Sequence, residues 1–236
     1  RHVLTGMAAA SACLIARPYP IGAGDPPPVV VEARATGIAQ LLDPPGPTTA
    51  VWGYDGRVPG PVLRVKQGEQ AFFRFKNSLA EPSSVHWHGI RIANAMDGAV
   101  PLTQEAVPPG GTFDYRFVCP DAGTYWYHPH VHEFQQLARG MAGALIVEEK
   151  EPIKVDQDLV LLIKDYKVEA DGTLSENFGT LFDRAHAGRI GNVITVNGLH
   201  EAVLPVKSGE RVRVRIINSS NSRVLKLNIP RVSPKI

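Results

Sequence analysis

Residues 65–78 read Val65-Lys-Gln-Gly-Glu-Gln-Ala-Phe-Phe-Arg-Phe-Lys-Asn-Ser78, and a similar stretch returns as Val206-Lys-Ser-Gly-Glu-Arg-Val-Arg-Val-Arg-Ile-Ile-Asn-Ser219. In each, a Gly-Glu turn precedes a run in which apolar and polar residues alternate. Such alternation is typical of a half-buried strand. The two stretches stay in step along their whole length, so they predict two successive copies of one β domain.

Similar short runs recur along the rest of the chain. They are rich in β-branched and aromatic residues and are separated by Gly, Pro, Asn and Asp. Strands are predicted at 29–35, 62–66, 71–75, 112–118, 145–147, 159–163, 193–196 and 212–217. Helical periodicity is scarce: 133–140 is the one helix predicted in the first half, and 177–191 reads as a long loop. This pattern predicts an all-β fold, either a sandwich or a Greek-key barrel.

Composition excludes several classes of protein. The 236 residues are 44% hydrophobic and 20% charged, which is typical of a globular chain. The net charge of +2 gives no electrostatic case for nucleic-acid binding or for an anionic membrane surface. The two cysteines, Cys13 and Cys119, are too few for a disulfide-stapled scaffold or a Cys-rich zinc or iron–sulfur site.

The first 28 residues are interpreted as an export signal and linker. Arg1 and His2 precede an apolar run at 3–16, which is too short to span a bilayer. With one more arginine in front, the start would resemble a twin-arginine signal, which exports folded, cofactor-loaded proteins. The alternatives are a buried helix or a lipidated Cys13. We therefore expect a periplasmic or secreted protein with no membrane span.

The repeat places a domain boundary near 149–152. The first domain is predicted at 29–149 and the second at 150–236. Since the second copy has fewer residues than the first, we expect it to be incomplete.

The histidines are unevenly distributed. Five of the eight lie between residues 86 and 132, and four of these form the pairs His86-Trp87-His88 and His128-Pro129-His130. On a strand, residues i and i+2 point to the same face, about 6.5–7 Å apart along the chain. Two such strands side by side offer four imidazole ligands, which suit copper, zinc, iron or nickel. The alternative is a set of histidines that binds no metal.

The internal repeat restricts this site to the first copy. The positions that correspond to His86-Trp87-His88 are Leu227-Asn228-Ile229 in the second copy. A purely structural role would not require the first copy to depart from aliphatic residues on that strand.

Several motifs together carry a family resemblance. They begin at Gly56-Arg-Val-Pro-Gly-Pro, His86-Trp-His-Gly-Ile, Asn94-Ala-Met-Asp-Gly, Asp121-Ala-Gly-Thr-Tyr-Trp-Tyr-His-Pro-His and Arg139-Gly-Met-Ala-Gly-Ala. This set resembles the first domain of multicopper oxidases, most of all the bacterial laccase-like and copper-resistance branch. Residues 193–229 resemble the start of the second domain of that family. The resemblance implies cupredoxin-like Greek-key β-sandwich domains, one complete and a second truncated.

The resemblance also implies copper as the cofactor and a role for each site residue. His86 would bind the type 2 copper, while His88, His128 and His130 would bind the type 3 pair. Asp97 matches the family's acidic residue beside the centre, where a carboxylate can relay protons to oxygen. The alternative for Asp97 is a turn residue in Asp97-Gly98.

Other side chains near these motifs are given supporting roles or none. Trp87, Trp126 and Tyr127 are expected to pack around the site. His132 is expected beside the site or on the surface. No role is assigned to His2, His186 and His200.

The family's electron-entry site is missing from the sequence. In that family a type 1 copper, bound by a Cys, passes electrons through a His-Cys-His run, and this chain has no such run. Cys119 is followed by Pro120 and has no neighbouring histidine. Only half of the trinuclear ligands and no type 1 site are therefore expected here, and the rest would come from a third cupredoxin domain.

The chain is accordingly interpreted as the N-terminal part of an exported multicopper oxidase, inactive on its own. The parent would couple oxidation of phenolic or organic donors, or of cuprous ion, to reduction of oxygen to water. Its partners would be oxygen and a small reducing substrate, and not nucleic acid. The alternatives are a non-catalytic copper-binding module, a metal-free cupredoxin-like scaffold or an inactive gene fragment.

Overall fold

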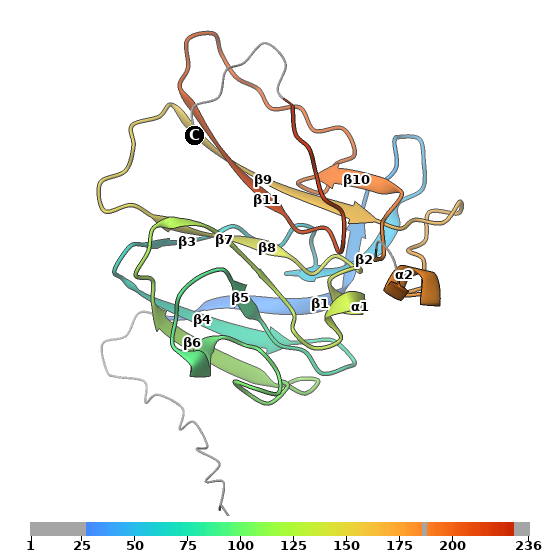
Figure 1. Ribbon diagram of the computed structural model, residues 1–236, viewed down its shortest axis with the longest axis horizontal. Coiled ribbons are helices and arrows are strands. Elements are labelled where there is room, and N and C mark those ends of the chain that lie inside the picture. Colours follow the sequence, from blue (N-terminus) through green and yellow to red (C-terminus); the bar gives the residue numbers. More distant parts are fainter. Residues whose placement is uncertain (1–26, 186–187, 229–236) are drawn as a thin grey trace, which may run out of the picture.

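A computed structural model describes residues 27–185 and 188–228. Over these residues the chain is built mainly of strands (Figure 1), so the all-β prediction is confirmed. The strands are β1 (Val29–Ala39), β2 (Thr49–Tyr54), β3 (Leu63–Lys66), β4 (Gln70–Asn77), β5 (His86–His88), β6 (Thr112–Val118), β7 (Gly123–His128), β8 (Gly143–Glu148), β9 (Gln157–Tyr166), β10 (Val193–Val196) and β11 (Val212–Asn218). The helices are the 3₁₀ helix η1 (Asn94–Met96), α1 (Glu133–Gln136) and α2 (Leu181–Ala185). Among the described residues, none of these helices is long and apolar enough to cross a membrane.

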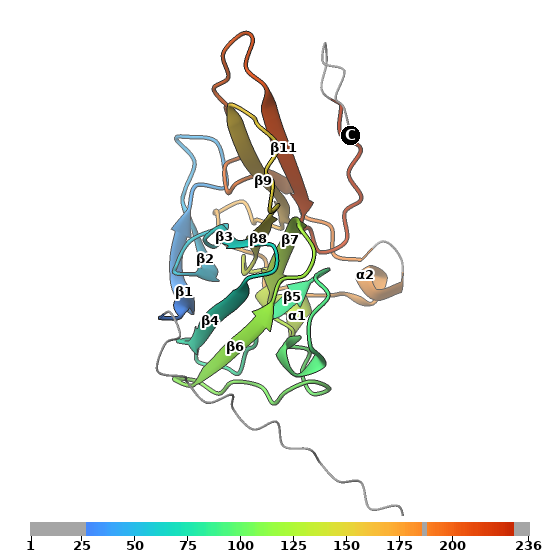
Figure 2. The ribbon, with the colours of Figure 1, turned by 90° about the vertical axis from the view of Figure 1, so that its left-hand side faces the viewer.

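The first half of the chain is a two-layered sandwich. One sheet has the order β2-β1-β4-β6 and the other β3-β8-β7-β5. Apolar side chains from both layers meet in a single core, in which Phe73 of β4 stacks on Trp87 of β5 with ring centroids 4.8 Å apart. The turned view in Figure 2 shows β4 and β6 in one layer and β7 and β8 in the other. Burial of this inner face follows from the alternation of the strand sequences.

The second half forms a three-stranded sheet, β10-β9-β11, that repeats part of the first. β9 pairs in parallel with β11 and antiparallel with β10, as β1 does with β4 and β2. The register is also repeated, since Ala33 pairs with Asn77 and Tyr54, while Ile163 pairs with Asn218 and Val196. The repeat seen in the sequence is therefore a structural repeat.

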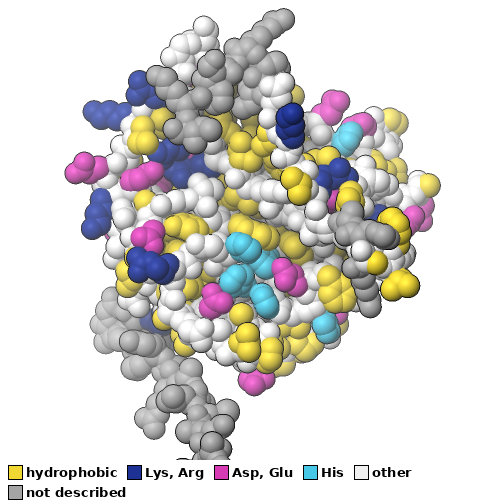
Figure 3. Space-filling model, in the orientation of Figure 1, with side chains coloured by type: hydrophobic (Ala, Val, Ile, Leu, Met, Phe, Trp, Pro, Cys, Tyr) yellow, Lys and Arg dark blue, Asp and Glu magenta, His cyan; other side chains and the backbone are white. Residues whose placement is uncertain are grey.

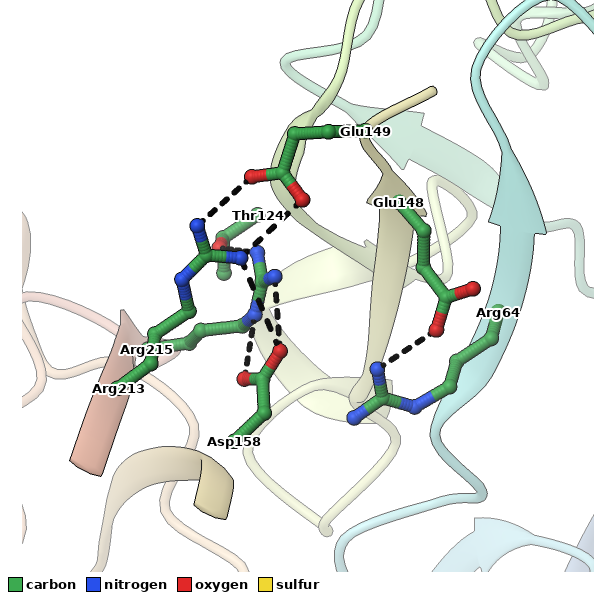
Figure 4. A network of polar contacts seen from close by, with 7 residues as sticks. All are labelled: Arg64, Thr124, Glu148, Glu149, Asp158, Arg213 and Arg215. Carbon is green, nitrogen blue, oxygen red and sulfur yellow. Dashed lines mark hydrogen bonds and ion pairs between the residues drawn. The ribbon is translucent and has the colours of Figure 1, made fainter. Parts of the chain in front are cut away.

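The two sheets of the first half and the β10-β9-β11 sheet are joined by charged side chains as well as an apolar cluster. Figure 4 shows Arg215 of β11 reaching toward Asp158 and Thr124. Its guanidinium donates to the Asp158 carboxylate at 2.7 and 2.9 Å and to the Thr124 hydroxyl at 3.1 Å. Arg213, next along the same face, donates to Glu149 at 2.9 and 3.2 Å. These contacts fix β9 and β11 against the sheet that carries β7.

The ends of several strands differ from the prediction by a few residues, and other elements differ more. β2 was not predicted. α1 ends at Gln136, short of the predicted 133–140, and the segment that follows contacts β2, where the Trp52 N–H donates to the Arg139 carbonyl at 3.0 Å. The predicted loop 177–191 contains α2, which is capped at its start by Thr180 and Asp183.

Candidate metal centre

The two histidine pairs lie on neighbouring strands in register. β5 and β7 are antiparallel, with His86 opposite His128 and His88 opposite Trp126. Trp87 and Tyr127, also opposite one another, point the other way into the core. Alternation along both strands thus sends the histidines to one face.

Three of the predicted ligands come close enough to share a metal ion. Potential ligand atoms of His86, His88 and His128 all lie within 4.8 Å of one another. The fourth, His130, has its ring centroid 5.4 Å from that of His86. Figure 3 shows histidine side chains gathered on one face of the molecule, with acidic side chains beside them. The structure therefore brings together all four histidines that the sequence singled out.

His128 is the most enclosed member of this cluster, with only 2% of its surface exposed. Its Nδ1 lies 2.9 Å from the Pro129 carbonyl oxygen and 3.2 Å from Glu133 Oε1. Two oxygen acceptors at Nδ1 favour the tautomer with the proton there, which leaves the lone pair on Nε2. Burial lowers the pKa of His128 to about 3, so the ring is neutral at physiological pH, as a metal ligand must be.

His88 lies directly beside His128 in the cluster. Its Nδ1 lies 3.2 Å from Nε2 of His128, so the two nitrogens converge on the same space. Burial, with the nearby His86 ring, lowers the pKa of His88 as well.

His86 is held by the segment that carries Asp97. Its Nδ1 lies 2.7 Å from the backbone oxygen of Asp97 and 3.4 Å from the carboxylate Oδ2. Asp97 ends the 3₁₀ helix η1, and Gly98 follows with φ +77. The sequence-predicted acid thus lies beside the histidines, but its carbonyl makes the shorter contact.

Ser84 joins the two segments that flank the histidines, and sequence reasoning missed it. It is fully buried, accepts from the His130 backbone N–H at 3.2 Å and donates to the Gly98 carbonyl at 3.0 Å. Its hydroxyl therefore ties His130 to the turn after Asp97.

Of the three aromatic residues expected around the site, Trp126 lies against the histidines, while Trp87 and Tyr127 lie on the core side of the same strands. Trp126 stacks on both His88 and His128, with ring centroids 4.8 and 4.2 Å apart. On the core side, the Tyr127 hydroxyl donates to the Pro61 carbonyl at 2.8 Å. The stacking of Trp126 restricts rotation of the His88 and His128 rings.

The remaining predicted residues lie apart from the cluster or outside the described residues. His132 is exposed, adopts a left-handed backbone with φ +44, and has Nδ1 3.9 Å from Glu81 Oε1. His200 contacts Asp43 at 2.7 Å. His2, His186 and Cys13 fall in the segments that the structure does not describe. Glu133 was also missed as a site residue, although an acidic residue directly after the His-rich run 128–132 was a visible signal.

The donor set fits copper. It consists of imidazoles only, a ligand type that suits copper. The neutral, enclosed His128 has its Nδ1 occupied by oxygen acceptors and its Nε2 directed at His88. Support of one ring nitrogen by an oxygen acceptor is the usual arrangement of a metal-binding histidine.

Comparison with known proteins gives one consistent result. A family profile described as multicopper oxidase matches residues 39–152. Multicopper oxidase MmcO of Mycobacterium tuberculosis is 32% identical over 218 residues, 80% of this chain and 43% of that protein. Copper resistance protein A of Pseudomonas syringae pv. tomato is 39% identical over 117 residues, 49% of this chain and 19% of that protein.

Solved structures agree. The multi-copper oxidase of Pseudomonas thermotolerans superposes with a TM-score of 0.81 at 40% identity, covering 86% of this chain and 48% of that one. The chain thus spans less than half the length of these relatives.

Proposed function

Because the chain belongs to the multicopper oxidase family, we propose that it supplies half of the trinuclear copper site of an oxidase. The whole protein would couple oxidation of phenolic or other organic donors, or of cuprous ion, to reduction of oxygen to water. We further propose an export segment at 1–28, a complete cupredoxin domain at 29–149 and part of a second at 150–236. The remaining copper ligands and the type 1 site would come from a third domain.

His86 is proposed to bind the type 2 copper, and His88, His128 and His130 the type 3 pair. The observation that carries this proposal is the register of β5 and β7, which sets His86 directly opposite His128. Copper bound there would accept electrons and pass them to oxygen. Three imidazoles whose potential ligand atoms lie within 4.8 Å of one another require little rearrangement to hold an ion.

The chain's own residues would then orient ligands and handle protons. The carbonyls of Asp97 and Pro129 hold the Nδ1 protons of His86 and His128, so both rings present Nε2. Asp97 Oδ2, 3.4 Å from His86, is proposed to hold a proton for oxygen reduction. Trp126 covers one face of His88 and His128 and excludes water from it.

Copper titration of the purified chain tests the ligand assignment. The parent chain is compared with the His86→Ala/His128→Ala double variant, and His200→Ala serves as a control because His200 pairs with Asp43 away from the cluster. We expect copper binding in the parent and in the control but not in the double variant. Equal binding by all three chains would contradict the assignment.

A second candidate function is a copper-binding module without oxidase activity. Among the described residues, Cys119 is the only cysteine, and it is buried, with a pKa raised to about 11 by desolvation. A thiol of that kind is a poor type 1 ligand. Oxygen consumption with a phenolic donor separates the two functions: an oxidase consumes oxygen once a third domain is supplied, and a binding module does not.

A further inference from the structure

Each of the two facing histidines has a carboxylate at its Nδ1. His86 has Asp97 Oδ2 at 3.4 Å, and His128 has Glu133 Oε1 at 3.2 Å. The sequence and the family resemblance single out the first carboxylate and leave the second without a role. Glu133 lies at the start of α1. Its side chain is 43% exposed to solvent, and its carboxylate contacts the buried His128.

The local backbone is arranged to hold Glu133 in this place. His132, directly before it, adopts φ +44 and ψ +44, a left-handed conformation that few non-glycine residues take. The turn bends the chain back over His128, and the His132 carbonyl accepts from the N–H groups of Gln135 and Gln136 at 2.8 and 3.0 Å. A strained backbone of this kind is retained where surrounding contacts require it.

A buried glutamine anchors the same helix beneath the site. Gln136 is fully buried, donates to Glu81 Oε1 and to the Pro82 carbonyl at 2.7 and 2.9 Å, and accepts from the Ser83 hydroxyl at 2.7 Å. This fixes α1 to the segment that leads into β5. The Glu133 carboxylate is therefore held relative to both histidine strands.

We propose that Glu133 is a positioning residue for His128. It shares the Nδ1 proton with the Pro129 carbonyl, fixes the tautomer and ring orientation, and so keeps the Nε2 lone pair directed at His88 and the metal. The inference rests on the proposed copper function for its metal-binding part. The tautomer of the metal-free ring does not depend on that function.

Nuclear magnetic resonance of ¹⁵N-histidine-labelled, metal-free chain tests the tautomer. In the parent, His128 is expected to carry its proton on Nδ1. Glu133→Ala is expected to mix in the Nε2–H form or to broaden the ring signals, because one of the two acceptors is lost. Glu133→Gln keeps an oxygen acceptor and is expected to restore the parent tautomer.

Titration with Cu²⁺ alone tests the consequence for binding. Loss of an acceptor behind a metal-bound histidine costs about 10–100-fold in affinity, so Glu133→Ala should weaken binding by that factor and Glu133→Gln by less. Gln135→Ala, which changes the same helix but leaves the carboxylate in place, is the control. Thermal unfolding of each variant verifies that the fold is intact.

The outcomes separate this inference from the proposed function. A parent chain that binds no Cu²⁺ but whose His128 tautomer changes in Glu133→Ala refutes copper binding by this half-site alone and supports the positioning role. Cu²⁺ binding that is lost in His86→Ala/His128→Ala but unchanged in Glu133→Ala, with an unchanged tautomer, overturns the role of Glu133.

Discussion

Backbone oxygens make the shortest contacts to the outer nitrogens of the two facing histidines. His86 Nδ1 lies 2.7 Å from the Asp97 carbonyl and His128 Nδ1 lies 2.9 Å from the Pro129 carbonyl. A carbonyl oxygen accepts a hydrogen bond at any pH, and a substitution of the side chain does not remove it. The orientation of these rings therefore depends on how the backbone is held.

Gly98 shows how the backbone beside Asp97 is held. Its φ is +77, and a Cβ at this position would lie 1.8 Å from the Val85 carbonyl oxygen. We expect Gly98→Ala to lower the free energy of unfolding by about 3 kcal/mol, since left-handed strain alone costs about 1–2 kcal/mol and the overlap adds to it. Copper affinity should fall as well, because the Asp97 carbonyl shifts away from His86.

Gly110→Ala is the matched control for that substitution. Gly110 has φ +75, but a Cβ there would meet no atom within 4 Å. Urea denaturation should show that Gly110→Ala lowers the free energy of unfolding only by the cost of the left-handed backbone. Gly98→Ala should lower it clearly more. Equal losses would mean that the contact with Val85 is relieved at no cost.

The Asp97 side chain is expected to matter less for binding than its carbonyl. Asp97→Asn keeps the carbonyl and the shape, and the carboxylate is 30% exposed. Cu²⁺ affinity should therefore change by less than about threefold, as for other exposed charges. His86→Ala removes a ligand and should cost more than about tenfold. A tenfold loss in Asp97→Asn would show that the carboxylate itself supports the ring.

At the scale of the element, the strands were more predictable than the helices. β6 and β10 have the predicted bounds, because alternation continues to their ends. After α1 ends at Gln136, the Arg139 carbonyl accepts a hydrogen bond from Trp52 of β2, far away in the sequence, and no local pattern reports this contact. The contacts of Ser84 with His130 and Gly98 were missed for the same reason.

The pair Arg215–Asp158 joins β11 to β9 on the face that meets the first sandwich. Arg215 is only 7% exposed and is bound by Asp158 at two atoms. We expect Asp158→Ala to lower the free energy of unfolding by about 3 kcal/mol, because a buried cation loses its partner. Urea denaturation measures the loss.

Glu148→Ala provides the comparison on the neighbouring strand. Glu148 pairs with Arg64 at 3.1 Å, and both side chains are 38% exposed. An exposed pair of this kind contributes less than about 1 kcal/mol. If Glu148→Ala costs as much as Asp158→Ala, burial of Arg215 is not what makes its pair important.

Lys164 of β9 makes stability depend on pH. It is 2% exposed, and burial lowers its pKa from 10.5 to about 7; Asp165 opposes the shift and Arg189 adds to it. Between pH 7 and 10.5 the unfolded chain binds this proton and the folded chain does not, so stability rises with pH across that window. Below pH 7 Lys164 is protonated in both the folded and the unfolded chain, and the full cost of burying its charge lowers the free energy of unfolding.

Lys164→Met isolates this contribution. At pH 6.5 the free energy of unfolding of the variant should exceed that of the parent by a few kcal/mol, since each unit of pKa shift corresponds to about 1.4 kcal/mol. This difference should shrink toward pH 10. Other groups titrate in this range, so the difference between the two chains is the quantity to follow by urea denaturation. A difference that does not change with pH would contradict a lowered pKa for Lys164.

At the scale of the whole molecule, the repeat and the four histidines were readable from the sequence, but their juxtaposition was not. Alternation predicted that each pair shares a face. The register that sets His86 opposite His128 is a long-range property of β5 and β7. The packing of β9 and β11 against the first sandwich is likewise a long-range property that the sequence does not report.

The structural repeat also identifies an apolar surface. Phe73 and Phe75 of β4 are buried in the first core at 2% and 0% exposure, and the equivalent β11 residues Val214 and Ile216 are 39% and 43% exposed. Ile194 of β10 adds to the same side of the sheet at 38%. A contiguous apolar face, unlike single exposed apolar residues, binds apolar probes and promotes association.

Val214→Thr/Ile216→Thr should therefore change the solution behaviour of this chain. We expect the parent to bind an anilinonaphthalene dye and the double variant to bind about half as much, in proportion to the apolar area removed. Ile38→Thr is the control, because Ile38 is 72% exposed on β1 and lies outside the β10-β9-β11 sheet. The unfolding free energy should change little, since threonine suits a strand. Dye binding that falls equally in Ile38→Thr would mean that scattered apolar residues, and not this sheet face, provide the surface.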